Sequence, residues 1–379
     1  MERIYLDHAA TTPLDTRVLE KMLPYFTSVY GNADSPHQTG RRAMAGVDEA
    51  RDTLAELLRA KQNEIYFTSG GTESGNWAML GGAYAKRKEG RTRVILSAIE
   101  HHAVLSSAER LEKDGFEVVY LPVNKGGRVE PNELKSRIDC KTALVAIMAV
   151  NNETGVVQPI DECAEIAHAN GALFFTDATQ SAPYMPIDTQ KCRADLIAFS
   201  AHKFYGPKGA GVLYIRNGTK MEKLVSGGEQ ERGMRGGTLN VPNIVGLAKA
   251  YELAREEMEE NNKKIAKISK IFLDGVEKID GTYRNGDSKN ALPSILNLRV
   301  KGVENTTFLY NMDLQGVSLA VGSACSSASI KPSHVLTAMG LSEIEVQESV
   351  RISLGKDNTE EEIRRTVEIM REVIKRLRG

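Results

Sequence analysis

The stretch Ser200-Ala201-His202-Lys203 follows an apolar run, residues 194–199, and precedes the turn-forming residues Tyr-Gly-Pro-Lys-Gly at 205–209. The apolar run predicts a β-strand that is buried on both faces, as strands of parallel sheets are. A lysine placed just beyond such a strand can hold an aldehyde as a Schiff base. Because lysines at strand ends are mostly solvated, the interpretation of Lys203 depends on the rest of the chain.

The chain from residue 64 to about residue 215 alternates short apolar runs with amphipathic ones. The apolar runs that predict strands are 65–67, 94–96, 118–121, 143–150, 172–175, 196–199 and 211–215. Helix-like segments lie between many of them, for example 75–88, 103–113 and 160–170. This alternation predicts an α/β fold with a mostly parallel seven-stranded sheet flanked by helices. We assign it to a large domain, residues 15–255.

The remaining residues, 1–14 and 256–379, predict a smaller α+β domain. A charged helix is expected from about 241 to 274, and the run 294–300, apolar at alternate positions, predicts a half-exposed antiparallel strand. Thr359 is followed three residues later by Glu362, which is a capping-box signature. A final amphipathic helix is therefore expected to begin there.

The composition excludes several classes of function. Lysine and arginine (49) nearly balance aspartate and glutamate (50) in the 379 residues, so no broad basic field indicates a nucleic-acid partner. No apolar run is long enough to span a membrane, and the first residues do not resemble a signal peptide, so we expect a cytoplasmic protein. The four cysteines form no Cys-x-x-Cys pair, which disfavours a zinc ribbon or a disulfide framework.

The residues Thr68-Ser69-Gly70-Gly71-Thr72-Glu73-Ser74 follow one predicted strand and open a helix. Glycines at a helix N-terminus let backbone N–H groups approach an anion, and Thr72 can add a hydroxyl donor. The stretch therefore predicts a phosphate site. The alternative is a plain strand-to-helix turn in which Thr72 caps the helix.

Two further strand ends carry groups that suit a flat heterocyclic cofactor. His101 can stack on a ring, whereas a zinc site at His101 and His102 lacks a partner at a fixed short spacing. Asp177 ends an apolar strand, where a carboxylate needs a partner, and a protonated pyridine nitrogen is one. Alternatively, Asp177 binds a backbone amide. With Lys203 and the phosphate site, these residues predict a pyridoxal phosphate pocket at one edge of the sheet.

Three more positions could carry chemistry. The amides of Asn151-Asn152 could bind cofactor or substrate oxygens, or could form a turn. Arg351 either forms a structural ion pair or grips a carboxylate. Cys325 lies among small residues (Gly-Ser-Ala-Cys-Ser-Ser), a context typical of an accessible, reactive thiol.

Along nearly its whole length the chain resembles cysteine desulfurases of the NifS/IscS type. The resemblance rests on the motifs at 6–13 (Leu-Asp-His-Ala-Ala-Thr-Thr-Pro), 68–73, 100–101, 151–155, 177–180, 200–203 and 322–325. It implies a fold-type I transferase that depends on pyridoxal 5′-phosphate and forms a homodimer. The loop around Cys325 resembles the long-loop branch, which serves iron–sulfur cluster scaffold proteins.

The resemblance also implies a role for each matching residue. Lys203 would be the Schiff-base lysine, His101 the stacking residue and proton shuttle, and Cys325 the sulfur acceptor. Cysteine would become alanine, and Cys325 would carry the sulfur as a persulfide, with a role as a transient iron–sulfur cluster ligand during transfer. The other implied contacts are Asp177 with the pyridine nitrogen; Gln180 with the ring oxygen; Gly71, Thr72, Ser200 and His202 with the phosphate; Thr238 with the phosphate of the other subunit; and Asn152 and Arg351 with the substrate carboxylate.

Two departures from the family pattern stand out. Gly75 stands where many members carry an acidic or amide residue, with little expected effect. The given residues stop at Arg378-Gly379, before the further tail that helps some relatives dock the scaffold, so we expect the geometry of partner docking to be open. The rival functions are another class V aminotransferase, a lyase that prefers selenocysteine, a cysteine–histidine hydrolase and a non-enzymatic interaction protein. Cys325 argues against the aminotransferase, and the presence of Lys203, Asp177 and Cys325 together argues against the interaction protein.

Overall fold

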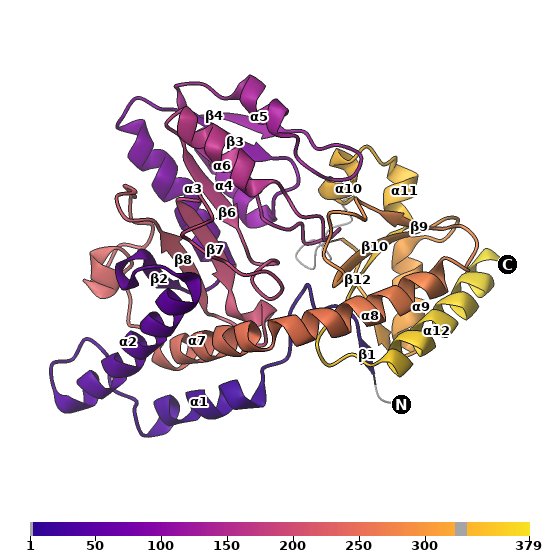
Figure 1. Ribbon diagram of the computed structural model, residues 1–379, viewed down its shortest axis with the longest axis horizontal. Coiled ribbons are helices and arrows are strands. Elements are labelled where there is room, and N and C mark those ends of the chain that lie inside the picture. The colour runs from indigo at the N-terminus through magenta and orange to yellow at the C-terminus, as the bar shows by residue number, and fades with distance from the viewer. Residues whose placement is uncertain (1–2, 323–331) are drawn as a thin grey trace.

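The computed structural model describes residues 3–322 and 332–379. Its largest element is a seven-stranded sheet in the order β2-β8-β7-β6-β5-β3-β4 (Figure 1). The strands are β2 (Ile65–Thr68), β3 (Arg93–Ser97), β4 (Glu117–Leu121), β5 (Thr142–Ala146), β6 (Leu173–Asp177), β7 (Leu196–Ser200) and β8 (Gly211–Ile215). Only β8 pairs antiparallel to its neighbours, so the mostly parallel sheet predicted from the sequence is confirmed.

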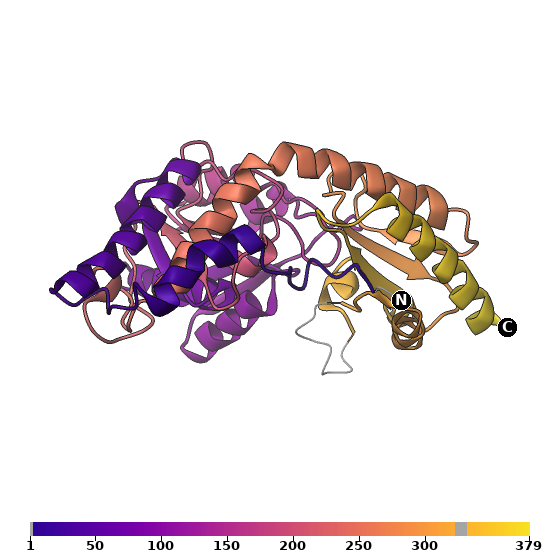
Figure 2. The same cartoon turned by 90° about the horizontal axis from the view of Figure 1, so that it is seen from below.

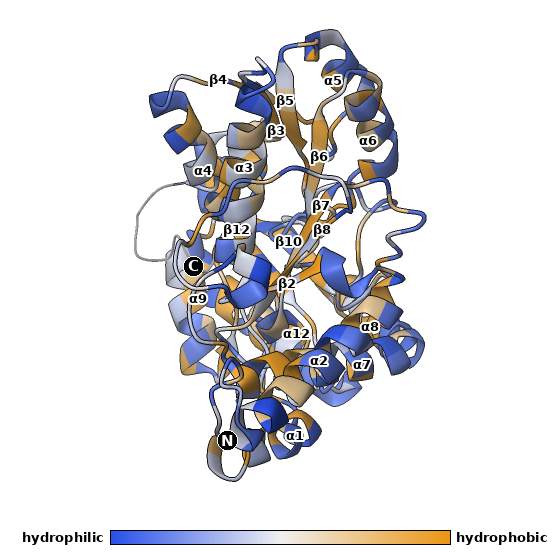
Figure 3. Ribbon diagram, turned by 90° about the vertical axis from the view of Figure 1, so that its left-hand side faces the viewer, coloured by the Kyte–Doolittle hydropathy of each residue, from blue (hydrophilic) through white to orange (hydrophobic). Residues whose placement is uncertain are grey.

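Helices cover both faces of this sheet. Successive residues of a strand point to opposite faces, and apolar side chains on both faces pack against helices. Phe175 packs on the face covered by α3 (Gly71–Arg87) and α4 (His102–Lys113). Phe174 packs on the other face, with α2 (Gln38–Leu58), α5 (Pro131–Arg137), α6 (Ile160–Ala169) and α7 (Val241–Glu256). Figure 3 shows the apolar strands between these helices. α1 (Thr16–Thr27) packs on α7.

A second, three-stranded antiparallel sheet, in the order β12-β10-β9, forms the other part of the molecule (Figure 2). Its strands are β9 (Thr282–Asn285), β10 (Ile295–Val300) and β12 (Ser349–Ser353), and β1 (Ile4–Tyr5) pairs with β11 (Val317–Ser318) beside them. The core of this part joins the strands to α8 (Met258–Val276), α9 (Asn305–Leu314) and α12 (Glu360–Arg378). The short helices α10 (His334–Ala338) and α11 (Glu343–Gln347) complete it.

Two predicted elements of this region need correction. The helix expected over 241–274 is two helices, because α7 ends at Glu256 and α8 begins at Met258. The strand expected to be half-exposed is β10, and apart from Arg299 it is buried. β10 lies between β9 and β12, and Asn297 on its supposedly exposed face donates a hydrogen bond to the carbonyl oxygen of Glu153 (3.3 Å) in the large part. The capping box at Thr359 is confirmed.

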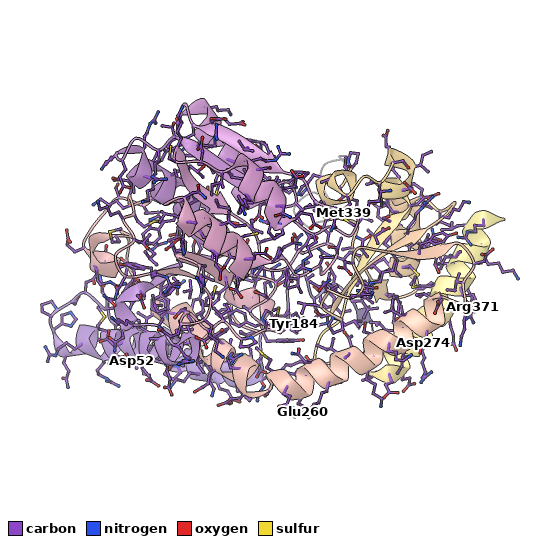
Figure 4. The ribbon with its side chains drawn as sticks, turned by 45° about the horizontal axis from the view of Figure 1, so that its top comes forward. Asp52, Tyr184, Glu260, Asp274, Met339 and Arg371 are labelled. Atoms are coloured by element: carbon purple, nitrogen blue, oxygen red, sulfur yellow. The ribbon has the colours of Figure 1, made fainter. Side chains whose placement is uncertain are left out.

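Segments from both parts meet at the C-terminal ends of β5, β6 and β7. The N-terminal segment 7–12 crosses between them: Asp7 forms a β-bridge with Ser353, and the N–H of Thr12 donates to the carbonyl oxygen of His202 (2.9 Å). Tyr184, labelled in Figure 4, packs on the core of the smaller part, and its hydroxyl donates to the carbonyl oxygen of Leu354 (3.4 Å). Within the described residues, no helix is both long and apolar enough to cross a bilayer.

Candidate active site

A pocket of about 160 Å³, open to solvent, lies at the edge of the large sheet where these segments meet. The predicted site residues that line it are Gly71, Thr72, His101, Asn152, Asp177, Gln180, Ser200, His202, Lys203 and Arg351. They come from the ends of four strands or the turns after them, from the start of α3 and from β12. Thr238 is exposed and does not line this pocket, and Cys325 lies outside the described residues.

Lys203 ends the single 3₁₀ turn that follows β7. Its side-chain Nζ donates hydrogen bonds to the carbonyl oxygens of Ala9 (2.6 Å) and Ala10 (2.8 Å). The Nε2 of Gln180 donates to the same oxygen of Ala9 (3.0 Å). The N-terminal segment therefore forms one wall of the pocket and holds the lysine in place.

The start of α3 has the form of an anion site. Its N-cap, Gly70, has φ 150°, a conformation that favours glycine, and has no side-chain cap. A Cβ added at Gly71 would lie 3.3 Å from the Oγ1 of Thr179, so a side chain there would crowd the pocket wall. That Oγ1 is buried and has no hydrogen-bond partner among the described residues. A cradle of backbone N–H groups beside an unused hydroxyl is what an anionic group requires.

His202 faces the same pocket as a neutral imidazole. Burial, together with the nearby positive charges of Lys203 and Lys208, lowers its pKa to about 4. Its Nδ1 lies 3.1 Å from the Oγ1 of Thr11. The ring is thus fixed by the N-terminal segment and can serve as a neutral hydrogen-bonding group.

His101 caps α4, and its Nδ1 accepts a hydrogen bond from the N–H of Ala103 (3.2 Å). A neutral ring that accepts at Nδ1 carries its proton on Nε2. Burial lowers the pKa of His101, the negative charge of Asp177 opposes that shift, and the positive charge of Lys203 adds to it. The lowered pKa favours the neutral ring, with Nδ1 as the acceptor and the proton on Nε2.

Asp177 and Arg351 each form the structural contact that the sequence analysis gave as the alternative to ligand binding. The Oδ1 of Asp177 accepts a hydrogen bond from the N–H of Thr179 (2.9 Å), while the residue also lines the pocket. Arg351 forms an ion pair with Asp7 (2.8 Å) and donates to the carbonyl oxygen of Asn152 (3.0 Å). Both residues thus combine a structural contact with a place in the pocket wall.

Sequence reasoning missed several residues of the pocket wall. Ala9 and Ala10 act through backbone oxygens, which no side-chain pattern reveals. Thr179 lies inside the motif 177–180, so its neighbours could have indicated it. Met148 and Val150 follow β5 and read as ordinary core residues.

Among the side chains that the structure describes, no group of three or more histidine, cysteine, aspartate or glutamate residues could hold a metal ion. The described cysteines also differ from a reactive thiol. Cys163 is buried, and burial raises its pKa to about 12, while burial also raises the pKa of Cys192. Cys140 is exposed and lies away from the pocket.

Comparison with known proteins agrees with this geometry. Residues 4–366 match the family model described as aminotransferase class-V. A curated cysteine desulfurase IscS of Methanosarcina thermophila is 46% identical over 99% of this chain and 93% of its own length. A putative cysteine desulfurase IscS 1 of Bacillus subtilis is also 46% identical, over the whole of both chains.

Solved structures show the same relationship. A structure titled NifS-like protein superimposes with a TM-score of 0.93 at 37% identity, covering 98% of this chain and 99% of its own. Another, titled SspA in complex with cysteine, gives a TM-score of 0.84 at 36% identity over 94% and 100% of the two chains. The chain therefore belongs to the class V aminotransferase family, with the fold of fold-type I pyridoxal phosphate enzymes, and within that family to the cysteine desulfurases of the NifS/IscS type.

Proposed function

We propose that the chain is a cysteine desulfurase that converts L-cysteine to L-alanine and passes the sulfur through Cys325 to iron–sulfur cluster assembly. The observation that carries the proposal is that one pocket joins the Lys203 amine, the Arg351 guanidinium and the anion site of α3. The Lys203 amine and the Arg351 guanidinium suit an amino acid substrate. The Lys203 amine and the anion site of α3 suit a cofactor that carries an aldehyde and a phosphate. We infer that the substrate is cysteine because one relative is named a cysteine desulfurase and one solved structure is titled as a complex with cysteine.

Pyridoxal 5′-phosphate fits the residues that are present. Gly71, Thr72, Ser200 and His202 would hold its phosphate, where Thr179 offers a buried hydroxyl without a described partner. Lys203 would hold its aldehyde carbon, and His101 would stack on its ring. When bound, the cofactor supplies an electron sink that weakens bonds at the Cα and Cβ of an amino acid.

The protein's own groups would then bind the substrate and move its protons. Arg351 and the Asn152 amide would hold the carboxylate, and the Nζ of Lys203 would take the proton from Cα. Asp177 would keep the ring nitrogen protonated, because a carboxylate stabilises a neighbouring positive charge. Gln180 would donate to the ring oxygen, and the Nε2 of His101 would serve as the proton shuttle.

Cys325 would be the sulfur acceptor. Its thiolate would attack the substrate sulfur and break the Cβ–S bond. The electron pair of that bond would stay with Cβ, which would gain a proton on the way to alanine, and Cys325 would keep the sulfur as a persulfide for the scaffold protein. A free thiol with this role needs a reducing compartment, which supports the cytoplasmic location.

A homodimer belongs to the same proposal. α1 exposes Leu19 (41%), Leu23 (51%) and Phe26 (56%), and such apolar surface is typical of an interface. Thr238 is exposed, as a residue that reaches a partner's phosphate would be in one isolated chain. Light scattering tests this proposal: a mass of one chain, 41.6 kDa, would contradict the dimer.

The function is tested by incubating the purified protein with pyridoxal 5′-phosphate and L-cysteine and assaying alanine and persulfide. Cys325→Ala should keep the cofactor and lose alanine production, whereas Cys140→Ala, at an exposed cysteine, should keep both. Turnover retained by Cys325→Ala would point to another acceptor. Amino transfer to a keto acid, or activity with selenocysteine alone, would favour one of the rival enzymes.

A further inference from the structure

Asp7 and Arg351 form an ion pair inside the pocket wall. The Oδ1 of Asp7 lies 2.8 Å from an Nη of Arg351, whose side chain is only 1% exposed, while that of Asp7 is 18% exposed. The two residues come from opposite ends of the chain and meet because Asp7 forms a β-bridge with Ser353 of the strand that carries Arg351. A buried guanidinium needs such a partner.

The remaining nitrogens of Arg351 are not equivalent. The other Nη donates to the carbonyl oxygen of Asn152 (3.0 Å), whereas the buried Nε has no hydrogen-bond partner among the described residues. Arg351 also lines the pocket, so its guanidinium keeps hydrogen-bonding capacity that the described residues do not use. A planar guanidinium that is bound at both Nη atoms is held in one orientation.

The backbone around Asp7 is itself held in place. The hydroxyl of Tyr5 lies within hydrogen-bonding distance of the carbonyl oxygens of Asp7 (3.0 Å) and Thr11 (3.1 Å). Ala9, between them, accepts from both Lys203 and Gln180. The carboxylate of Asp7 is thus presented to Arg351 by a segment that is anchored on both sides.

We propose that Asp7 is a positioning residue for substrate recognition: it holds Arg351 so that the guanidinium binds the α-carboxylate of an amino acid. The inference rests on the proposed function, because Arg351 is the residue assigned there to the carboxylate. Without the charge of Asp7, the ion pair would be lost, and only neutral oxygens, such as the Asn152 carbonyl, would hold the guanidinium, which would then be fixed less firmly. Carboxylate binding would then weaken, while contacts to the amino group would be unaffected.

The test compares two ligands that differ only in the carboxylate, L-alanine and ethylamine. Each is titrated into the holoenzyme, and the absorbance of the bound cofactor reports the dissociation constant. Asp7→Asn should weaken L-alanine binding about tenfold, or 1.4 kcal/mol, and change ethylamine binding less than about twofold. Asp7→Glu, which keeps the charge but moves it, should give a smaller loss.

Asp15→Asn is the matched control, since Asp15 is also a shielded carboxylate (8% exposed side chain) in ion pairs with Arg17 and Lys356 outside this pocket. It should leave both dissociation constants unchanged. The proposal would be overturned if Asp7→Asn weakened the binding of both ligands equally, or if it left the binding of L-alanine unchanged. It would also be overturned if the wild type bound the two ligands with equal affinity. Should Asp7→Asn not fold, Asp7→Glu carries the same comparison.

The titration needs no sulfur transfer, so it is independent of the cysteine assay. If the wild type made no alanine from cysteine, but Asp7→Asn weakened the binding of L-alanine and not that of ethylamine, only the desulfurase function would be refuted. A protein that makes alanine but shows no such loss would refute the role of Asp7 alone.

Discussion

The Nζ of Lys203 lies 2.6 Å from the carbonyl oxygen of Ala9, a residue 194 positions earlier in the chain. The carbonyl oxygen of Ala10 accepts a second hydrogen bond from the same nitrogen. The segment that provides these oxygens also holds Arg351 through Asp7 and His202 through Thr11. One short N-terminal segment therefore links three groups of the pocket that come from both parts of the molecule.

Lys203→Ala should remove the visible absorbance that the bound cofactor gives when it is linked to the lysine. Alanine production should fall by about a hundredfold to ten-thousandfold, because proton transfer at Cα loses its base. The measurements are an absorbance spectrum and an alanine assay. Lys208→Ala, at an exposed lysine of the next turn, is the control and should keep the colour. An unchanged spectrum for Lys203→Ala would contradict the assignment.

Gly71→Ala should weaken cofactor binding about tenfold. Its Cβ would lie 3.3 Å from the Oγ1 of Thr179 and 3.5 Å from the Cβ of Ser200, where the phosphate is expected. Gly75→Ala, one turn later in α3, is the control, because its Cβ would meet Val104 at an ordinary 3.8 Å. It should keep cofactor affinity and stabilise the protein by up to about 1 kcal/mol through helix propensity. Equal cofactor affinity in both variants, measured by fluorescence titration, would refute an anion site at Gly71.

Glu73→Gln should lower both stability and cofactor affinity. Glu73 forms a two-point ion pair with Arg235 (2.8 and 3.0 Å) and accepts from the N–H of Ser69 (2.8 Å), so it fixes the first turn of α3. Burial raises the pKa of Glu73, but these hydrogen bonds outweigh it and the net shift is downward. We expect a loss of about 1–3 kcal/mol in the free energy of unfolding, measured with urea.

The control for this variant is Glu89→Gln, which removes a more exposed ion pair with Lys86 beyond the other end of α3. That change should cost less than about 1 kcal/mol. Arg235, the partner of Glu73, lies three residues before Thr238, which would reach the phosphate in a partner subunit. Glu73→Gln therefore also tests whether the start of α3 holds the segment that carries Thr238. Unchanged cofactor affinity would argue against that link.

The large sheet was predictable because each of its strands is a short run of apolar residues bounded by turns. Strand 143–150 was predicted too long, since β5 ends at Ala146 and, of the residues after it, Met148 and Val150 line the pocket. The smaller part was harder. Burial of β10 depends on Asn297 meeting Glu153, and no local pattern reveals a contact across 144 positions. The limits proposed for the two domains stay a prediction.

The pocket residues were predictable where a motif combined a strand end with a polar side chain, as at His101, Asp177 and Lys203. Asp7 stood in a matching motif, but its partner Arg351 lies 344 positions away, so only the fold reveals the ion pair. The roles of Cys325 and Thr238 stay predictions, the first outside the described residues and the second dependent on a partner subunit.

Glu100, next to His101, should give the protein a pH-dependent stability. Its carboxyl is fully buried, accepts at Oε1 from Ser97 and from the N–H of Met148, and has no described partner at Oε2. Burial raises its pKa to about 8, despite those two hydrogen bonds. Between its usual value of 4.5 and about 8 the folded protein thus holds a proton that the unfolded chain has lost.

Stability from Glu100 is therefore complete below pH 4.5 and declines as the pH rises toward 8, by up to about 1.4 kcal/mol per pH unit. Glu100→Gln copies the protonated carboxyl and removes this slope. The free energy of unfolding, measured with urea at pH 5.5 and pH 8, should fall more steeply for the wild type than for the variant. Glu109→Gln, on the adjoining helix α4, should keep the wild-type slope. Parallel slopes for the wild type and Glu100→Gln would show that the buried carboxyl is already ionised at pH 5.5.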